Sequence, residues 1–377
     1  MKYHYQYLED EWTKGYWDFM LYILDNYNLD QKYIWYCISE SPNITYEIIQ
    51  NNLDKPWCWG GLSENPNIQW ELIQNNPDKS WNWRCLSKNP NITWDIIENN
   101  LEKPWEWEWI SKNPNITWEI IQNNPDKPWV WYWISQNPNI TWDIIQNNLD
   151  KPWCWVGLLG NKNITWDIIQ NNTNIIQLEP IEYEFEYEFQ LTGFQDNPNM
   201  CWDIIKDNSI HKWDWDWNEL SKHPNMTWDI ITNNLSYPWN DFCGDLSQNP
   251  NITWDIIQNN PNPYNKKNGK WDWGGISKNP NITWEIIQNN PNNEWRWGAV
   301  SDNPTLTWEI IQNNLDIEWF WYGIVRNKME LGKKEWINNK LRLHIIKTLQ
   351  IQRHWRNCSC NPEYKLAQRC LLRLHES

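Results

Sequence analysis

The most constraining feature of this chain is a phrase of 24 residues that repeats along most of its length. Residues 90–113 read Pro-Asn-Ile-Thr-Trp-Asp-Ile-Ile-Glu-Asn-Asn-Leu-Glu-Lys-Pro-Trp-Glu-Trp-Glu-Trp-Ile-Ser-Lys-Asn, and the phrase restarts at Pro114. Its first aromatic residue recurs at Tyr46, Trp70, Trp94, Trp118, Trp142, Trp166, Trp202, Trp228, Trp254, Trp284 and Trp308. Five successive spacings are 24, and the later ones are 36, 26, 26, 30 and 24. A period of this length indicates stacked repeats.

The first half of each phrase predicts a short helix with a defined start. Thr93 can accept a hydrogen bond from a backbone N–H of the first turn, as a helix N-cap does. Asp95 then lies where the helix dipole favours an anion. Ile92 and Ile97 flank this start and can pack on each other as a hydrophobic staple.

The second half, residues 103–111, is open to two interpretations. Trp105, Trp107 and Trp109 alternate in a way that is typical of a strand. Other copies have a glycine pair in this stretch, at 60–61 for example, and lack the third Trp. We therefore favour a short α- or 3₁₀-helix.

One repeat of two short segments buries too little apolar surface to fold alone, so neighbours must share a continuous core. The sequence predicts an all-α solenoid of about 11–12 repeats that forms an elongated particle. We expect an N-terminal cap at 1–40, which contains a degenerate repeat around Trp17, and the solenoid at 41–322. A basic helical tail at 323–377 completes the chain, with apolar residues at helical spacing over 336–356 and a second helix from Pro362 to Leu374.

The phrase also carries a resemblance to a known family. Leu86-Ser87-Lys88-Asn89-Pro90-Asn91-Ile92-Thr93-Trp94-Asp95-Ile96-Ile97 resembles the leucine-rich repeat variant, whose 24-residue units alternate α- and 3₁₀-helices. The resemblance covers about residues 33–322 and implies a right-handed superhelix. The Trp-rich phrase is also similar to repeat proteins of large DNA viruses of amoebae, which implies a viral protein of the host cytoplasm or the virion.

Charge divides the chain into an acidic body and a basic tail. The formal net charge is -16, from 32 Lys and Arg against 48 Asp and Glu. Residues 326–377 hold 12 of the basic residues and four of the acidic ones, a net of +8, which leaves -24 for residues 1–325. This balance argues against general binding of the body to nucleic acid or to anionic membranes. Nucleic acid remains a possible partner of the tail 326–377.

The sequence also indicates several classes to which the protein does not belong. No apolar run approaches the ~20 residues of a membrane span, and we expect none. The nine Cys show no regular pairing, which favours reduced thiols inside a cell. No Gly-rich phosphate loop, Gly-x-Ser-x-Gly elbow or His-Glu-x-x-His motif occurs. We predict a non-enzymatic protein that needs no cofactor.

The repeated Trp residues form three classes: the anchor aromatic of each phrase, the Trp that follows the Pro turn, and the Trp two residues later. They are core residues or the lining of a groove, and we expect anchor residues such as Trp118 and Trp142 to be buried. If one class stacks on a peptide, a Pro-rich segment or a sugar, the class that follows the Pro turn is the best candidate. Its members include Trp105, Trp129 and Trp153.

An insertion at 178–194 replaces the second half of one repeat and is a candidate partner site. Its glutamates and apolar residues alternate as in a strand with one apolar face. Such a face needs a cover from the solenoid, a second copy or another protein. The candidate contact residues are Glu182, Tyr183, Glu184, Phe185, Glu186, Tyr187, Glu188 and Phe189.

The tail supplies the remaining candidates. Arg353 and Arg356 lie in a segment that opens like a calmodulin-binding IQ motif without its downstream Gly, and we interpret it as a docking or packaging segment. Cys358, Cys360 and Cys370 lack the spacing of a zinc knuckle, so no metal is assigned. We expect a protein-interaction scaffold with a protein partner, the alternatives being an aromatic-groove binder and a nucleic-acid adaptor that acts through the tail. The sequence leaves the oligomeric state open.

Overall fold

The structure, a computed structural model, describes residues 2–172, 197–206, 215–237, 239, 245–261 and 271–360. Within these ranges the chain forms helices and turns and no strand, which confirms the all-α prediction. Two long helices stand near the ends of the chain, α1 (Lys2–Asn26) and α25 (Glu330–Cys360). The helices between them have four to ten residues each.

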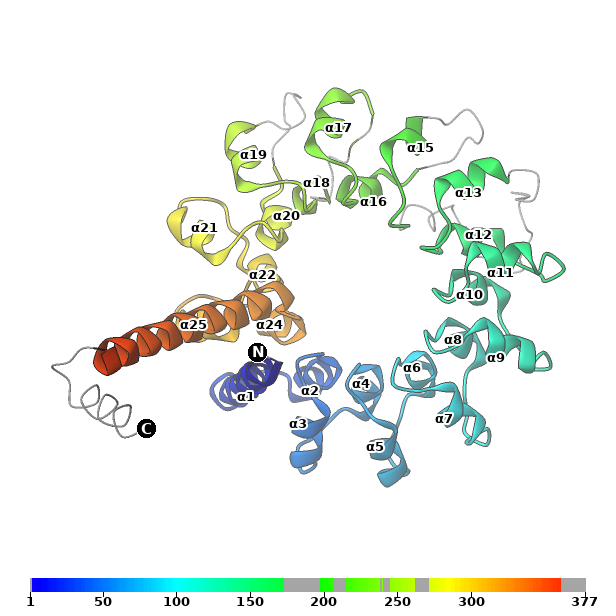
Figure 1. Ribbon diagram of the computed structural model, residues 1–377, viewed down its shortest axis with the longest axis horizontal. Helices are drawn as coiled ribbons and strands as arrows, with labels where there is room; N and C mark the ends of the chain where they lie inside the picture. Colours follow the sequence, from blue (N-terminus) through cyan, green and yellow to red (C-terminus); the bar gives the residue numbers. More distant parts are fainter. Residues whose placement is uncertain are drawn as a thin grey trace, which may run out of the picture.

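The short helices form two rows, one inside the other (Figure 1). The inner row contains α2 (Gln31–Glu40), α4 (Trp59–Glu64), α6 (Trp83–Lys88), α8 (Trp107–Lys112), α10 (Trp131–Gln136), α12 (Trp155–Leu159), α16 (Trp217–Lys222), α18 (Asp245–Gln248), α20 (Trp273–Lys278), α22 (Trp297–Val300) and α24 (Trp321–Arg326). The outer row contains α3 (Tyr46–Asn51), α5 (Trp70–Asn75), α7 (Trp94–Glu98), α9 (Trp118–Asn123), α11 (Trp142–Gln146), α13 (Trp166–Asn171), α15 (Trp202–Lys206), α17 (Trp228–Asn233), α19 (Trp254–Asn259), α21 (Trp284–Asn289) and α23 (Trp308–Gln312). A repeat whose two halves are both described contributes one helix to each row, as residues 90–113 do with α7 and α8.

The outer helices begin as their sequence predicts. The Thr93 hydroxyl accepts from the backbone N–H of Ile96, and Asp95 lies in the first turn of α7. Ile92 and Ile97 are both fully buried. The second half of the repeat also forms an α-helix, α8, so the strand interpretation of residues 103–111 is wrong and the short α–α form of the solenoid is the one observed.

Buried asparagines join each repeat to the one before it. The side-chain amide of Asn113 lies within hydrogen-bond distance of the carbonyl oxygens of Ser87, Asn89 and Ile92, at 2.9, 3.1 and 3.1 Å. Its own Oδ1 accepts from the backbone N–H of Asn115 at 2.8 Å. Equivalent ladder positions are Asn65, Asn89, Asn137, Asn161, Asn197, Asn249, Asn279, Asn303 and Asn327. The ladder satisfies carbonyl groups that burial would otherwise leave unpaired.

A buried serine makes a second link between successive inner helices. The Ser87 hydroxyl donates to the carbonyl oxygen of Trp83 at 2.7 Å and accepts the backbone N–H of Glu106 at 3.0 Å. This N–H belongs to the residue before α8, so the serine fixes where the next inner helix begins.

The indoles of successive repeats pack edge to face. Trp105 meets Trp83 at 5.0 Å and 87° and lies 5.8 Å from Trp70, while its Nε1 donates to the carbonyl oxygen of Asn100. The anchor class that contains Trp118 and Trp142 was expected to be buried, but both residues are only half-buried. The indoles that follow the Pro turn occupy the core instead, together with the isoleucines.

The array does not have two open ends, because its first and last repeats meet (Figure 1). Helix α2 packs against α24, which closes the inner row. Helix α1 contacts α23 and α25, and it fills the outer row between the ends. The solenoid is therefore a ring, and the expectation of an elongated particle is corrected.

Candidate functional site

The seam where the ring closes holds the base of α25 in place. The Arg326 guanidinium lies 3.4 Å from the Glu40 carboxylate, and the side-chain amide of Asn43 donates to the carbonyl oxygen of Asn327 at 3.1 Å. The Tyr322 hydroxyl accepts the backbone N–H of Asp30 at 3.1 Å. These contacts join residues that lie close to 300 positions apart in the chain.

Three indoles pack where α1, α23 and α25 meet. Trp12 lies 6.2 Å from Trp308 and 5.5 Å from Trp336, both in edge-to-face arrangements. Their buried Nε1 atoms have no hydrogen-bond partner among the described residues. Apolar packing of the three rings therefore stabilises this contact.

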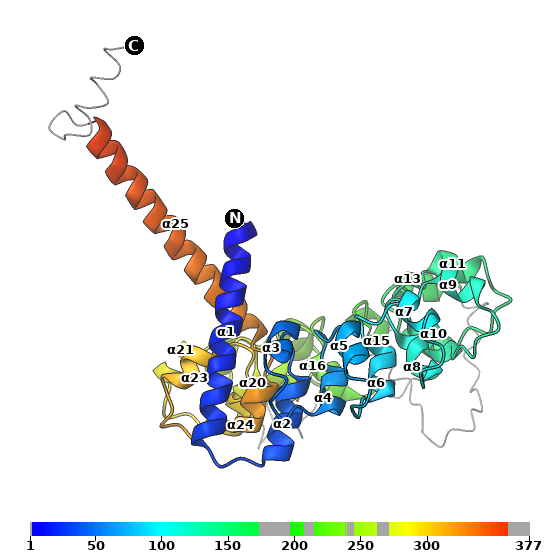
Figure 2. The ribbon, with the colours of Figure 1, turned by 90° about the horizontal axis from the view of Figure 1, so that it is seen from below.

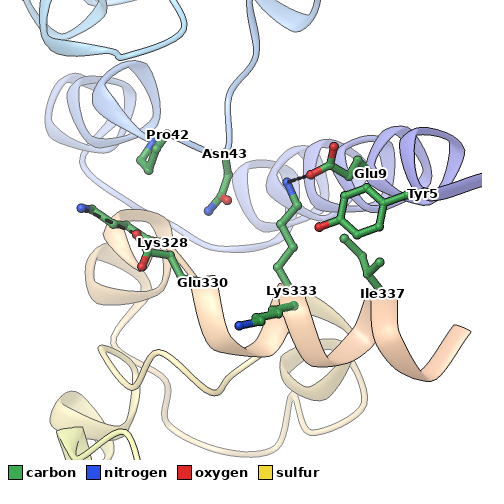
Figure 3. Close-up of a pocket in the computed structure, with 9 residues that line it drawn as sticks. Tyr5, Glu9, Pro42, Asn43, Lys328, Glu330, Lys333 and Ile337 are labelled. Atoms are coloured by element: carbon green, nitrogen blue, oxygen red, sulfur yellow. Dashed lines mark ion pairs between the residues drawn. The ribbon is translucent and has the colours of Figure 1, made fainter. Parts of the chain in front are cut away.

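A surface cleft of about 360 Å³ lies on the same seam (Figure 3). Figure 3 shows Lys333 of α25 reaching toward Glu9 of α1, at 3.9 Å, beside Tyr5. The lining residues are Tyr5, Glu9, Pro42, Asn43, Lys328, Glu330, Lys333, Lys334 and Ile337. Its ion pairs are partly or fully exposed, and such pairs contribute little to affinity or stability. We assign the cleft a structural role in seating α25 on α1.

Beyond the seam, α25 extends away from the ring (Figure 2). Lys340 still pairs with Glu11 of α1 at 3.7 Å, and Leu341 packs partly against the core. From Arg342 to Arg356 every side chain is exposed. This projecting segment, residues 342–356, exposes six large apolar side chains: Leu343 55%, Ile345 51%, Ile346 51%, Leu349 57%, Ile351 69% and Trp355 59%.

The structure tests the predicted aromatic groove. Trp105, Trp129 and Trp153 are only 7–9% exposed, since each ring lies against indoles of earlier repeats. Of the two interpretations, these three residues therefore follow the core one rather than the lining of an open groove. Most described members of the other two Trp classes are half-buried, although Trp35 and Trp202 are buried.

The structure describes the predicted contact residues of the tail but not those of the insertion. Residues 182–189 of the insertion lie outside the described residues, so their proposed role stays a prediction. Arg353 and Arg356 both belong to the projecting segment of α25 and are exposed. The apolar residues expected at 336–356 share this single long helix, while the second helix predicted at 362–374 lies outside the described part of the chain.

The described residues support neither a metal site nor a reactive thiol at Cys85. No group of three His, Cys, Asp or Glu side chains there could hold a metal ion. Cys370 lies outside the described ranges, so the question of a metal at the tail cysteines stays open. Burial and the nearby Glu64 carboxylate raise the pKa of the Cys85 thiol to about 11, which keeps it protonated at neutral pH.

Sequence reasoning missed the residues of the seam. Tyr16, Gly15 and Tyr322 belong to no repeated class, and pairing of the two ends leaves no periodic signal. The sequence shows Trp at 109 and 133 where other repeats have smaller residues such as Gly61 and Cys85. It does not show which cations lie beside these two indoles. The Arg84 guanidinium lies over the indole of Trp109, and the Lys112 ammonium lies over the indole of Trp133.

None of the helices in the described ranges combines the length and hydrophobicity that crossing a bilayer requires. No protein-family model, no curated protein and no solved structure matches this chain.

Proposed function

We propose that this protein is a non-enzymatic interaction scaffold in which a closed Trp-rich ring presents α25 to a protein partner. The observation that carries the proposal is the projecting segment 342–356, which exposes six large apolar side chains. Exposed apolar surface on this scale is characteristic of interaction sites. The seam contacts fix the first turns of α25 to the ring, so the projecting segment starts from a defined position.

The placement of the apolar residues favours an enclosing partner. At about 100° per residue, Ile345 and Leu349 share one side of the helix, while Leu343 and Ile351 lie on other sides. A flat surface such as a membrane would cover only one of these sides. Two or more partner helices packed around α25 would cover most of them, as in a helical bundle.

The basic residues set the electrostatic preference of this partner. Arg342, Lys347 and Arg353 interleave with the apolar residues and are exposed. An acidic rim around an apolar contact would complement them and accelerate association. The resemblance to viral repeat proteins supports a setting in host cytoplasm or the virion, which is part of the proposal.

The test replaces apolar contacts without disturbing the ring. Leu343→Glu combined with Leu349→Glu removes two exposed apolar side chains, and Gln350→Glu adds the same kind of charge on the same helix as the control. Each full-length variant is compared with the parent by light scattering and by quantitative crosslinking in a cell extract. We expect the double variant to lose its crosslinked protein while the melting temperature stays constant.

Unchanged crosslinking in the double variant would reject α25 as the attachment element. A nucleic-acid adaptor predicts a different pattern: Arg353→Gln would reduce binding to a short DNA duplex, and added salt would abolish it. Binding of DNA without any bound protein would favour that alternative.

A further inference from the structure

A cationic aromatic patch on the inner row stands apart from the repeat pattern. It spans α6, α8 and α10, which are neighbours in the ring (Figure 1). Two half-buried indoles form its centre, Trp109 on α8 and Trp133 on α10, with ring centroids 5.9 Å apart and planes at 32°. Other repeats have much smaller residues at the same position, for example Gly61, Cys85 and Gly157. The repeat fold therefore does not require these two indoles.

Three cations surround the two rings. The Arg84 guanidinium lies 4.2 Å from the centroid of Trp109, and the Lys88 ammonium lies 5.3 Å from it. The Lys112 ammonium lies 4.1 Å from the centroid of Trp133 and 5.8 Å from that of Trp109. Indole faces attract cations at these distances, so the rings hold the cations in one place.

These cations have no carboxylate partner among the described residues. Other lysines of the body do have one, for example Lys127 with Asp126 at 4.0 Å and Lys151 with Asp150 at 2.8 Å. The nearby Glu108 carboxylate accepts the Nε1–H of Trp133 at 3.3 Å instead. Burial and the Lys88 ammonium lower the pKa of Lys112, which a bound anion would reverse. In a chain of net charge -16, three unpaired cations on one surface are an uncommon concentration of positive charge.

We propose that the patch of Arg84, Lys88, Lys112, Trp109 and Trp133 binds a short acidic peptide of a partner protein. The guanidinium of Arg84 is exposed and can bind a carboxylate with two parallel N–H donors. Lys112 can hold a second carboxylate, and apolar or aromatic side chains between the two acids would contact the indoles. This site is independent of α25 and adds a second attachment point on the ring.

A short peptide fits the surrounding charge better than a nucleic acid does. Glu64, Glu106 and Glu108 are exposed. The Glu108 carboxylate contacts Trp133 of the patch, and the Glu64 carboxylate accepts from the Cys85 thiol at 3.4 Å, next to Arg84. Charges separated by more than about 8 Å are largely screened at physiological salt, so only carboxylates that directly contact Arg84, Lys88 or Lys112 would be strongly attracted, as in a motif of two or three acids. A strand of phosphates would extend beyond the patch and meet these glutamates.

The test measures binding of a fluorescent (Glu-Tyr)₄ peptide to the full-length protein by anisotropy. The matched probe (Gln-Tyr)₄ has the same rings without the charges. Arg84→Gln combined with Lys112→Gln should weaken binding of (Glu-Tyr)₄ by about tenfold or more, as expected for two lost charge-assisted contacts. Lys127→Gln removes an equally positive but already paired residue and should leave the affinity unchanged. Trp109→Ala, which places there the residue found at 299, should also weaken binding.

Three results would overturn the proposal. In the first, the peptide binds the Arg84 and Lys112 double variant as tightly as the parent. In the second, an oligo-dT probe binds the patch more tightly than (Glu-Tyr)₄ and loses affinity in the same variants. In the third, the parent binds no peptide while a variant lacking residues 179–190 does, which would make the chain's own acidic segment the occupant. Circular dichroism on every variant confirms that each remains folded.

Discussion

The hydroxyl of Tyr16 donates a hydrogen bond to the carbonyl oxygen of Val325 at 3.2 Å, across 309 residues of sequence. The same hydroxyl lies 3.3 Å from that of Ser41. Ser41 occupies the position that holds the ladder asparagine in other repeats, for example Asn65. Val325 occupies the position that holds the buried serine, for example Ser301. Tyr16 thus supplies the polar contact that an asparagine makes at most of the other repeat boundaries, for example Asn113 to Ser87. One side chain from α1 completes the ladder around the ring.

Tyr16→Phe should loosen the seam and alter its response to pH. Removing the hydroxyl leaves the Val325 carbonyl unpaired at a cost of about 1–3 kcal/mol at neutral pH. Burial raises the pKa of Tyr16 to about 12 from 10.0, so its contribution is complete below pH 10 and is lost as the pH rises toward 12. The variant should therefore show a smaller loss of stability between pH 10 and 12 in urea titrations. Equal losses in parent and variant would contradict the assignment.

Gly15→Ala should open the seam even though alanine favours helices. A Cβ at this position would collide with the Trp308 indole. Overpacking of this kind costs about 1–3 kcal/mol. Hydrogen exchange over α1 should accelerate while the middle of the solenoid keeps its protection. Gly298→Ala is the matched control, since nothing lies within 4 Å of its added Cβ, and it should be neutral or stabilising.

Asn113→Ala should destabilise the ring far more than an exposed asparagine does. The substitution removes an amide that bonds to carbonyls of the preceding repeat and leaves buried acceptors unpaired. We expect a loss of about 3 kcal/mol or more in the free energy of unfolding, at about 1–3 kcal/mol for each unpaired group. Asn123→Ala, at an exposed position in α9, should change it by less than about 0.5 kcal/mol. Similar values for the two variants would argue against the ladder.

Trp129→Ala should cost more stability than Trp118→Ala. Trp129 is 9% exposed and its Nε1 donates to Asn124, whereas Trp118 is half-buried. Truncation of a buried Trp costs about 3–5 kcal/mol, and a half-buried one should lose less. Chemical denaturation at 25 °C measures both. The reverse order would mean that the anchor class, and not the class that follows the Pro turn, carries the core.

Much of the local structure could be predicted because it depends on neighbours in the chain. The cap at Thr93 and the staple of Ile92 and Ile97 follow from residues within five positions of one another. The period itself predicts stacking. The burial of each Trp class could not be ranked, because three apolar classes compete for one core and only packing decides which ring points inward.

The sequence by itself determined the helical repeat, its capping and the need to stack, since each rests on short-range chemistry repeated at a fixed period. Only the tertiary structure decided that the stack closes, that Trp105 lies inside and that α25 stands clear of the ring. Closure depends on the small rotation between neighbouring repeats, which accumulates around the array and leaves no mark at any one residue. The contact between Tyr16 and Val325 exists because that rotation brings the two ends together.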